Sequence, residues 1–260
     1  MGKAVTRYPG AQLIHAHAHS TRTTSAGGFR YSHTSAARLH GLHLWNVDVR
    51  IQLTQPVPPS PDHHGPDVVC HTGLVPEADQ ATIKGLGTTT LERTVTDCGL
   101  LLLYRQALIL TDHALRAGAS RAALDAAAAH MDGRAGVRNL RRVLAAADSR
   151  SESPGETLTR DLITRLRLPA PEPQVEVLTR LGYYRLDFAW RQRKIALEFD
   201  GKGKYFDYRP TREVLFEERR REKALTEDGW VFIRVEWKDL FREQDFKGRL
   251  TRALASRPSI

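Results

Sequence analysis

The chain has 260 residues, with 39 Lys and Arg against 30 Asp and Glu, a formal net charge of +9 and a pI of about 9.8. Only two cysteines are present, Cys70 and Cys98, far apart in sequence, which excludes a disulfide framework and a zinc ribbon and favours a reducing compartment. No window approaches the roughly 18 consecutive apolar residues of a membrane span, and no signal-peptide core is present. We therefore expect a cytoplasmic protein without membrane association.

The basic charge extends over both halves of the chain. Residues 1–150 contain 16 of the 39 basic and 11 of the 30 acidic residues, which leaves 23 and 19 for residues 151–260. Lys and Arg neutralise phosphates and release their counterions, so this balance favours a polyanionic partner such as DNA. The length allows two domains that each bury a core.

Residues 1–34 are polar and lack apolar periodicity, which predicts partial disorder. His15, His17 and His19 alternate in this segment. In a strand they would lie on one side and allow a zinc site, but histidines of an unstructured N-terminus are the simpler interpretation, because no Cys or carboxylate is near them.

The segment 35–148 has the pattern of a mostly helical domain with a few strands. Alternating apolar residues indicate the strands, and Ala-rich runs separated by glycines indicate the helices. The expected elements are a helix at 35–41, strands at 47–53 and 68–71, and helices at 88–102, 106–115, 121–130 and 137–148.

A polar segment, 148–156, separates this part from the rest, and we place the domain boundary between residues 150 and 151. Ser153 and Pro154 have the N-cap and first-turn identities of a new helix. The elements expected after it are strands at 174–178, 183–190 and 194–199, a helix at 211–228, a strand at 230–235 and a helix at 245–255. The order α-β-β-β-α-β-α predicts an α+β or α/β fold.

Acidic residues stand on two adjacent expected strands that are otherwise apolar. Asp187 lies in one strand, and Glu198 and Asp200 end the next. A carboxylate is costly to bury among strand residues unless a cation or hydrogen bonds compensate it. Mg²⁺ takes oxygen ligands from one or two carboxylates and completes its shell with water and substrate phosphate. The pattern therefore predicts a site for Mg²⁺ or Mn²⁺.

These residues and their order resemble the PD-(D/E)XK nuclease superfamily, specifically its branch similar to very-short-patch-repair (Vsr) endonucleases. The resemblance covers residues 151–260 and rests on the following positions: Glu156, Arg185-Leu-Asp187-Phe, Leu197-Glu198-Phe-Asp200-Gly201, Arg221, Leu225 and Asp228-Gly-Trp-Val-Phe-Ile-Arg234-Val. It implies a restriction-endonuclease-like α-β-β-β-α-β core that cleaves DNA with a divalent metal ion.

The resemblance also implies roles for individual side chains. Asp187 and Glu198 would be the principal metal ligands, and Glu156 would support the metal from the first helix. Glu156 has an alternative role, because Ser153-Pro-Gly-Glu156 has the pattern of a capping box. Arg221 would face the sheet and hold a phosphate or a carboxylate, unlike its neighbours, which pair along the solvated helix face. Gln174 either touches the site or is a surface amide.

Asp200 departs from the superfamily pattern, in which a lysine usually follows the motif Glu by two positions. Asp200 would then be a further metal ligand, and Lys202 or Lys204 would supply the missing ammonium, unless these two lysines are ordinary solvated residues. A fold that lacks its lysine can also persist as a binding module.

Residues 30–148 resemble the AbiEi-family antitoxins of type IV toxin–antitoxin and phage-defence systems. The resemblance is carried by Ser35-Ala-Ala-Arg-Leu-His-Gly-Leu42, Thr89-Thr-Leu-Glu-Arg93-Thr-Val-Thr-Asp97 and Asp112-His-Ala-Leu-Arg-Ala-Gly118. That family normally begins with a winged helix-turn-helix, and we find no convincing recognition helix ahead of residue 35. Asp97 and Asp112 are expected to have structural roles, such as pairing with Arg93 and Arg116.

The expected function is a Mg²⁺-dependent DNA endonuclease in repair or phage defence, joined to an AbiEi-like domain that positions DNA or a protein partner. The alternative is a non-catalytic DNA-binding regulator or antitoxin that retains the nuclease fold. RNA cleavage is a third interpretation, although no aromatic stacking platform is evident.

Overall fold

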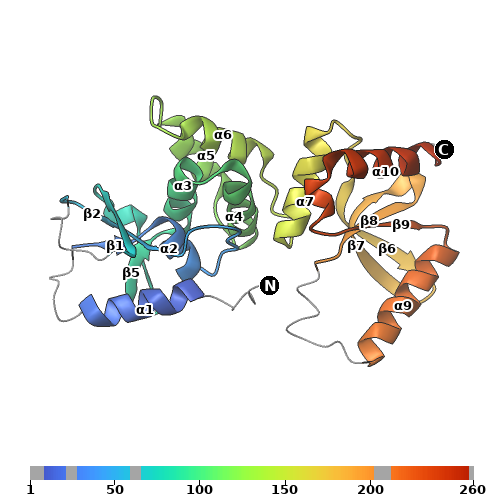
Figure 1. The fold of residues 1–260 in the computed structure, drawn as a ribbon, viewed down its shortest axis with the longest axis horizontal. Coiled ribbons are helices and arrows are strands. Elements are labelled where there is room, and N and C mark those ends of the chain that lie inside the picture. Colours follow the sequence, from blue (N-terminus) through green and yellow to red (C-terminus); the bar gives the residue numbers. More distant parts are fainter. Residues whose placement is uncertain (1–8, 22–27, 59–65, 202–211, 258–260) are drawn as a thin grey trace. The chain divides into compact units, whose positions relative to one another are not determined.

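The computed structural model describes residues 9–21, 28–58, 66–201 and 212–257 (Figure 1). The chain has an α+β fold and divides into two compact units, Met1–Ser149 and Arg150–Ile260, next to the boundary placed from the sequence. None of the described helices is long and apolar enough to cross a membrane.

The N-terminal unit contains a mixed five-stranded sheet in the order β3-β2-β1-β5-β4. Its strands are β1 (Arg30–Tyr31), β2 (Ile51–Gln55), β3 (Val68–Thr72), β4 (Gln80–Ile83) and β5 (Leu86–Thr89). Only β2 and β3 were expected, and β2 begins four residues later than the predicted start at 47. The hairpin from β4 to β5 turns on Lys84 and Gly85, both with positive φ, at 50° and 78°.

Helices contribute to the hydrophobic clusters of this unit. Their bounds are α1 (Pro9–Thr21), α2 (His33–Leu39), α3 (Leu91–Leu101), α4 (Tyr104–Arg116), α5 (Arg121–Ala129) and α6 (Val137–Ala146). The larger core lies among α2–α6 and includes Val95, Leu110, Leu124 and Leu140. Another cluster joins Ile14 of α1 to Tyr31 and Ile51 of the sheet.

Within the segment 1–34, for which we expected partial disorder, residues 9–21 form α1, and residues 1–8 and 22–27 lie outside the described residues. Ile14 is about 1% exposed and holds the helix in place. His15 and His19 are exposed, whereas His17 Nδ1 lies 2.9 Å from the hydroxyl of Tyr31. Because the segment is helical, His15 and His19, four residues apart, share a face that His17 does not, so the three histidines do not form the one-sided row of a strand.

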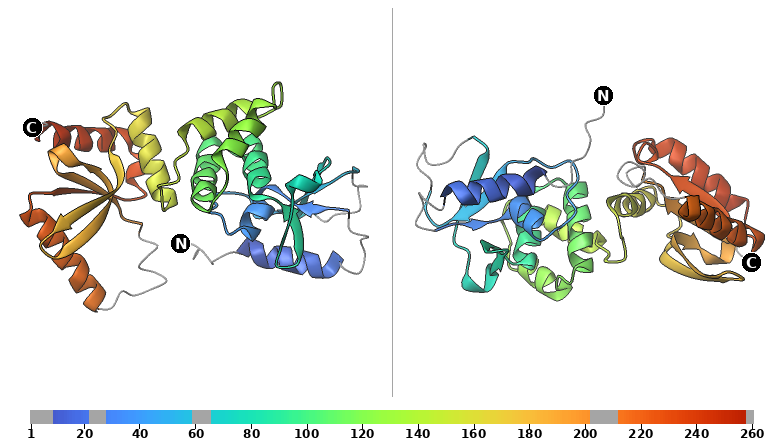
Figure 2. Two further views of the ribbon diagram at one scale, coloured as in Figure 1. Left: turned by 180° about the vertical axis from the view of Figure 1, so that it is seen from behind. Right: turned by 90° about the horizontal axis from the view of Figure 1, so that it is seen from below.

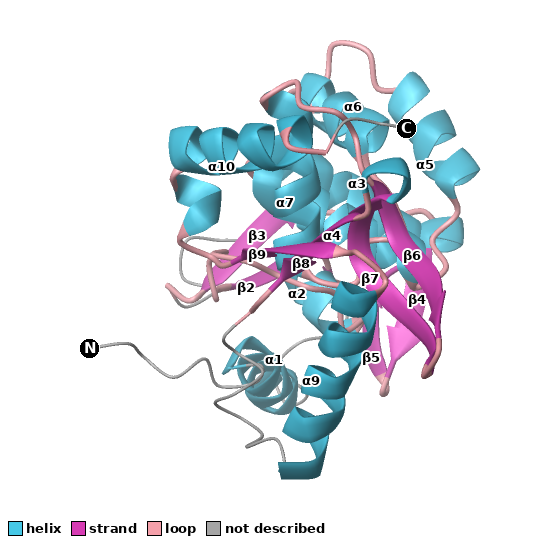
Figure 3. Cartoon of the chain, turned by 90° about the vertical axis from the view of Figure 1, so that its right-hand side faces the viewer, coloured by secondary structure: helices cyan, strands magenta, loops and turns pink. Residues whose placement is uncertain are grey.

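The C-terminal unit has the predicted order of elements, α-β-β-β-α-β-α. They are α7 (Pro154–Arg165), β6 (Glu172–Thr179), β7 (Gly182–Trp190), β8 (Ile195–Phe199), α9 (Arg212–Glu227), β9 (Val231–Val235) and α10 (Glu243–Ala255). The sheet order is β6-β7-β8-β9, antiparallel except for the parallel pair β8–β9. Figures 2 and 3 show α7 and α10 on one side of this sheet and α9 on the other.

Leu225 of α9 packs on one face of the sheet against Val175, Leu186 and Ala196. The opposite face is also buried: Phe188 of β7 and Phe246 of α10 are each about 1% exposed. The sheet is therefore covered on both sides, and polar side chains within its strands must find partners inside the unit.

Gly155 allows the first turn of α7 to lie directly against Phe199, at the end of β8. A Cβ added at Gly155 would lie 1.9 Å from the Phe199 ring. We expect Gly155→Ala to destabilise the protein by about 1–3 kcal/mol, because a buried ring and a helix terminus would have to separate. Gly248→Ala is the matched control.

At Gly248, inside α10, an added Cβ meets only the end of Arg252 at 3.5 Å, so alanine there should stabilise the helix by about 0.5–1 kcal/mol. Urea denaturation of both variants measures the difference. Equal effects of the two substitutions would contradict the close packing of Gly155 on Phe199.

Candidate active site

The carboxyl groups of Asp187 and Glu198 come from neighbouring antiparallel strands. The β7–β8 register pairs Phe188 with Leu197, so Asp187 and Glu198 are the next positions along the two strands. Asp187 Oδ2 accepts a hydrogen bond from the backbone N–H of Phe199 at 2.8 Å, which holds Asp187 at the end of β8. The structure therefore brings these two acids together, as the sequence predicts.

β7 departs from regular alternation at Asp187. Leu186 and Ala189, three residues apart, belong to the same packed cluster, whereas regular alternation would place them on opposite faces. Gln174 occupies the position opposite Asp187 on β6, between the pairs Pro173–Phe188 and Val175–Leu186, and has a φ of 53°. The strand is therefore distorted next to Asp187, on the side of β6.

The carboxyl group of Glu198 is buried and incompletely compensated. Burial raises the pKa of its carboxyl to about 7, and the nearby Asp187 adds to the rise, while Arg221 opposes it. Its Oε1 is buried without a hydrogen-bond partner among the described residues. The closest cation is the Arg221 guanidinium, with Nη2 at 4.0 Å. The carboxylate of Glu198 therefore lacks part of the compensation that a buried anion requires.

Glu156 receives the cap of Ser153, but its own carboxylate bonds to Glu152 and Gln174, so the reciprocal capping box considered for it is not formed. It lies in the first turn of α7, where its N–H donates to the hydroxyl of the N-cap Ser153 at 3.2 Å. Its own carboxylate, however, accepts from the Glu152 N–H and from Gln174 Nε2, both at 2.9 Å. Burial, and then the charge of Asp187, raise the pKa of Glu156, so its carboxylate lies within the electrostatic reach of the strand acids.

Gln174 is part of this group of side chains and is not the surface amide that we considered. Its amide bridges β6 to the Glu156 carboxylate on α7. Gln174 could have been identified only by its position opposite Asp187, and that position depends on the register between β6 and β7.

Arg221 extends from α9 to the sheet. Its guanidinium donates to the backbone carbonyl of Arg185 and lies over the ring of Tyr184, 5.4 Å from the ring centroid. About a third of the side chain is exposed, and it is 4.0 Å from Glu198. It is thus partly accessible, beside the carboxylates, where a phosphate could approach.

The position usually occupied by lysine is Asp200 in this chain, and its N–H extends the β8–β9 pairing by donating to Val235 O at 2.8 Å. Lys202 and Lys204 lie outside the described residues. A second cation that was not singled out from the sequence is Arg234, which is paired with Glu198 in the β8–β9 register and bonded to Glu222 at 2.7 Å.

The described residues nowhere bring three or more His, Cys, Asp or Glu side chains together in a way that could hold a metal ion. The proposed four-carboxylate ligand set of Asp187, Glu198, Asp200 and Glu156 is therefore not assembled. The pair Asp187 and Glu198 still fits Mg²⁺, which binds through one or two carboxylates and otherwise through water and phosphate. The unpartnered Oε1 of Glu198 is a hard oxygen donor of the required kind.

Comparison with known proteins identifies two relatives, both uncharacterized proteins of Mycobacterium tuberculosis, one from strain CDC 1551 and one from strain H37Rv. The chain is 29% identical to each over 175 residues, which are 66% of this chain and 62% of the relative. The chain thus spans less than two thirds of the length of these relatives. No family model and no solved structure matches the chain.

Proposed function

We propose that the C-terminal unit is a metal-dependent DNA endonuclease. The observation that carries the proposal is the approach of Asp187 and Glu198 on adjacent strands, with a carboxylate oxygen left unpartnered and a pKa raised to about 7. Carboxylates so placed favour a cation that binds between them and completes the partial compensation that Arg221 gives Glu198. The net charge of +9 suits a phosphodiester substrate.

Each residue of the site has a distinct role in the proposed reaction. Asp187 and Glu198 would hold Mg²⁺ or Mn²⁺, which when bound polarises a phosphodiester and lowers the pKa of a water. Arg221, within reach of Glu198 and partly exposed, would bind a phosphate oxygen in place of the missing lysine. Glu156 and Gln174 position the pair by joining α7 to β6.

A second candidate is a DNA-binding regulator or antitoxin without catalysis. Asp200 in place of the usual lysine favours it, because an acid there adds negative charge where the reaction needs positive charge. The regulator would bind DNA through basic residues of the chain, whose net charge is +9, independently of metal.

Incubation of the full chain with supercoiled plasmid distinguishes the two functions. A nuclease should convert it to nicked or linear DNA with Mg²⁺ or Mn²⁺ and leave it intact with EDTA. If the protein retards DNA in a gel under all these conditions and never cuts it, the regulator is the correct function.

A further inference from the structure

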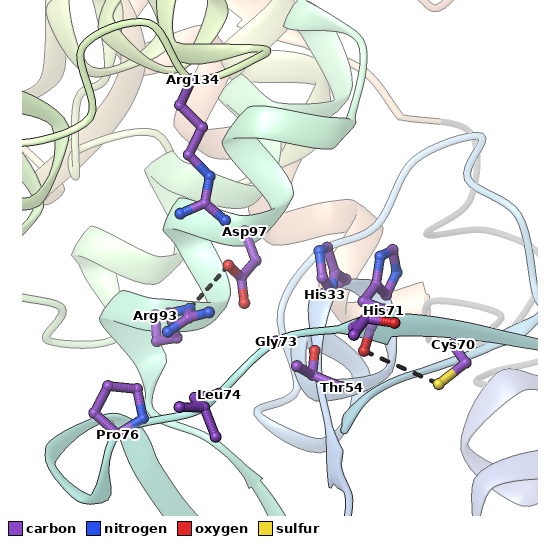
Figure 4. A pocket seen from close by; sticks show the side chains of 11 residues that line it. His33, Thr54, Cys70, His71, Gly73, Leu74, Pro76, Arg93, Asp97 and Arg134 are labelled. Atoms are coloured by element: carbon purple, nitrogen blue, oxygen red, sulfur yellow. Dashed lines mark hydrogen bonds and ion pairs between the residues drawn. The ribbon is translucent and has the colours of Figure 1, made fainter. Parts of the chain in front are cut away.

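The N-terminal unit contains a polar cavity that neither the nuclease proposal nor the antitoxin resemblance explains. Its volume is about 600 Å³, within the roughly 300–1,000 Å³ typical of small-molecule sites. Residues from five segments line it, including His33 of α2, His71 of β3, Arg93 and Asp97 of α3, and Arg134 before α6 (Figure 4). All of them belong to one unit, so the cavity exists without the C-terminal unit.

Asp97 gives the cavity an acceptor that lacks a partner. The residue is 3% exposed, and its Oδ1 accepts from Arg93 Nε at 2.9 Å. Its Oδ2 is buried and has no hydrogen-bond partner among the described residues. A buried polar atom left without a bond costs about 1–3 kcal/mol, and more when charged. Asp97 therefore favours a ligand that brings an O–H or N–H donor into the cavity.

Arg134 supplies a cation on the other side of Asp97. It is exposed, and Figure 4 shows its guanidinium extending toward the cavity from the segment that precedes α6. No ion pair joins it to another described residue, whereas Arg93 is committed to Asp97 and to Asp79, each at 2.9 Å. Arg134 is thus the guanidinium that remains available for an anionic group.

The two histidines do not add positive charge. His33 and His71 stack with ring centroids 3.7 Å apart. Burial, and then the charges of His71, Arg93 and Arg134, lower the pKa of His33 to about 3, and burial lowers the pKa of His71. Both are neutral at physiological pH, and the formal charges of Arg93, Arg134, Asp79 and Asp97 sum to zero, although only Arg93 is ion-paired. The cavity is consequently not a general anion trap.

A ligand for this cavity needs an anionic group for Arg134 and, a short distance away, a hydroxyl or N–H donor for Asp97. We propose that the cavity binds a nucleotide, with its phosphate on Arg134 and a sugar hydroxyl or base N–H on Asp97. The stacked imidazoles of His33 and His71 provide a flat aromatic surface beside the polar groups. The nucleotide is either free or the 5′-phosphorylated end of a DNA strand, since both present the same groups.

Calorimetric titration of the full chain tests this proposal, with adenosine and guanosine 5′-monophosphates, their nucleosides, inorganic phosphate and arginine as ligands. We expect at least one nucleotide to bind more tightly than its nucleoside and than phosphate. Arg134→Ala should weaken that binding about tenfold or more, as loss of a charged hydrogen bond implies. Arg138→Ala, which removes an exposed arginine of α6 outside the cavity lining, should change it less than about twofold.

Asp97→Asn should also weaken nucleotide binding, and its melting temperature shows whether loss of the Arg93 pair has damaged the fold. Arg134→Ala does not carry that risk, because the residue is exposed. A 5′-phosphorylated oligonucleotide compared with its 5′-hydroxyl form, in the Arg134 and Arg138 variants, distinguishes a strand end from a free nucleotide. The proposal is overturned if no nucleotide exceeds phosphate, if arginine binds in preference, or if the Arg134 and Arg138 variants bind nucleotide equally.

Discussion

Glu198→Gln should make the protein more stable than its parent at about pH 8 and not at about pH 4. The folded state raises the pKa of Glu198 from 4.5 to about 7, so it holds a proton that the unfolded chain releases. The stability that this proton contributes is complete below about pH 4.5 and is lost as the pH rises through about 7.

Glutamine keeps the shape of the side chain and has no charge to desolvate. Each unit of pKa shift corresponds to about 1.4 kcal/mol of stability. We discount the shift of Glu198 because Asp187 shares the effect and part of the side chain meets solvent. The variant should therefore be more stable than the parent by about 2 kcal/mol at about pH 8. Urea denaturation of parent and variant at both pH values measures it. Glu176→Gln, at an exposed position of β6, is the control and should behave alike at both. A Glu198 variant less stable than the parent at about pH 8 would show that the carboxylate is already compensated.

Replacing either strand acid should abolish most of the cleavage. Asp187→Asn and Glu198→Gln each replace a carboxylate by an amide, which is a much weaker metal ligand. We therefore expect the rate of DNA cleavage to fall by about 10²–10³-fold in each variant. The same variants should bind DNA at least as well as the parent, because each removes a negative charge.

The measurement is plasmid nicking followed in time, together with DNA binding in EDTA, and Glu176→Gln serves again as the control. Cleavage that survives in both acid variants would assign it to a different site or to a contaminant. Loss of DNA binding together with cleavage would indicate damage to the fold.

The sequence was informative where local residue type decides the structure. An acid within an apolar strand stands out, so Asp187 and Glu198 could be selected from the sequence, and the caps and glycines delimited the helices. The short strands of the N-terminal sheet could not be found, because β1 has two residues and the β4–β5 hairpin turns on Lys-Gly without a strong turn signature.

Contacts between residues far apart in the sequence could not be predicted from it either. Gln174 approaches Glu156 through a distorted strand conformation that no residue type in that segment requires. Asp97 was correctly paired with Arg93, but the residue also lines a cavity formed by segments far apart in sequence, which only the fold brings together.

Titration of Mn²⁺ or Mg²⁺ into the full chain tests most directly whether Asp187 and Glu198 form a cation site. We expect saturable binding that releases a proton below about pH 7, because Glu198 must ionise to coordinate, and that is proton-neutral at about pH 8. Asp187→Asn and Glu198→Gln should abolish this binding, and Glu176→Gln should preserve it. Equal binding by all four proteins, or none by the parent, would contradict a metal site between the two strands.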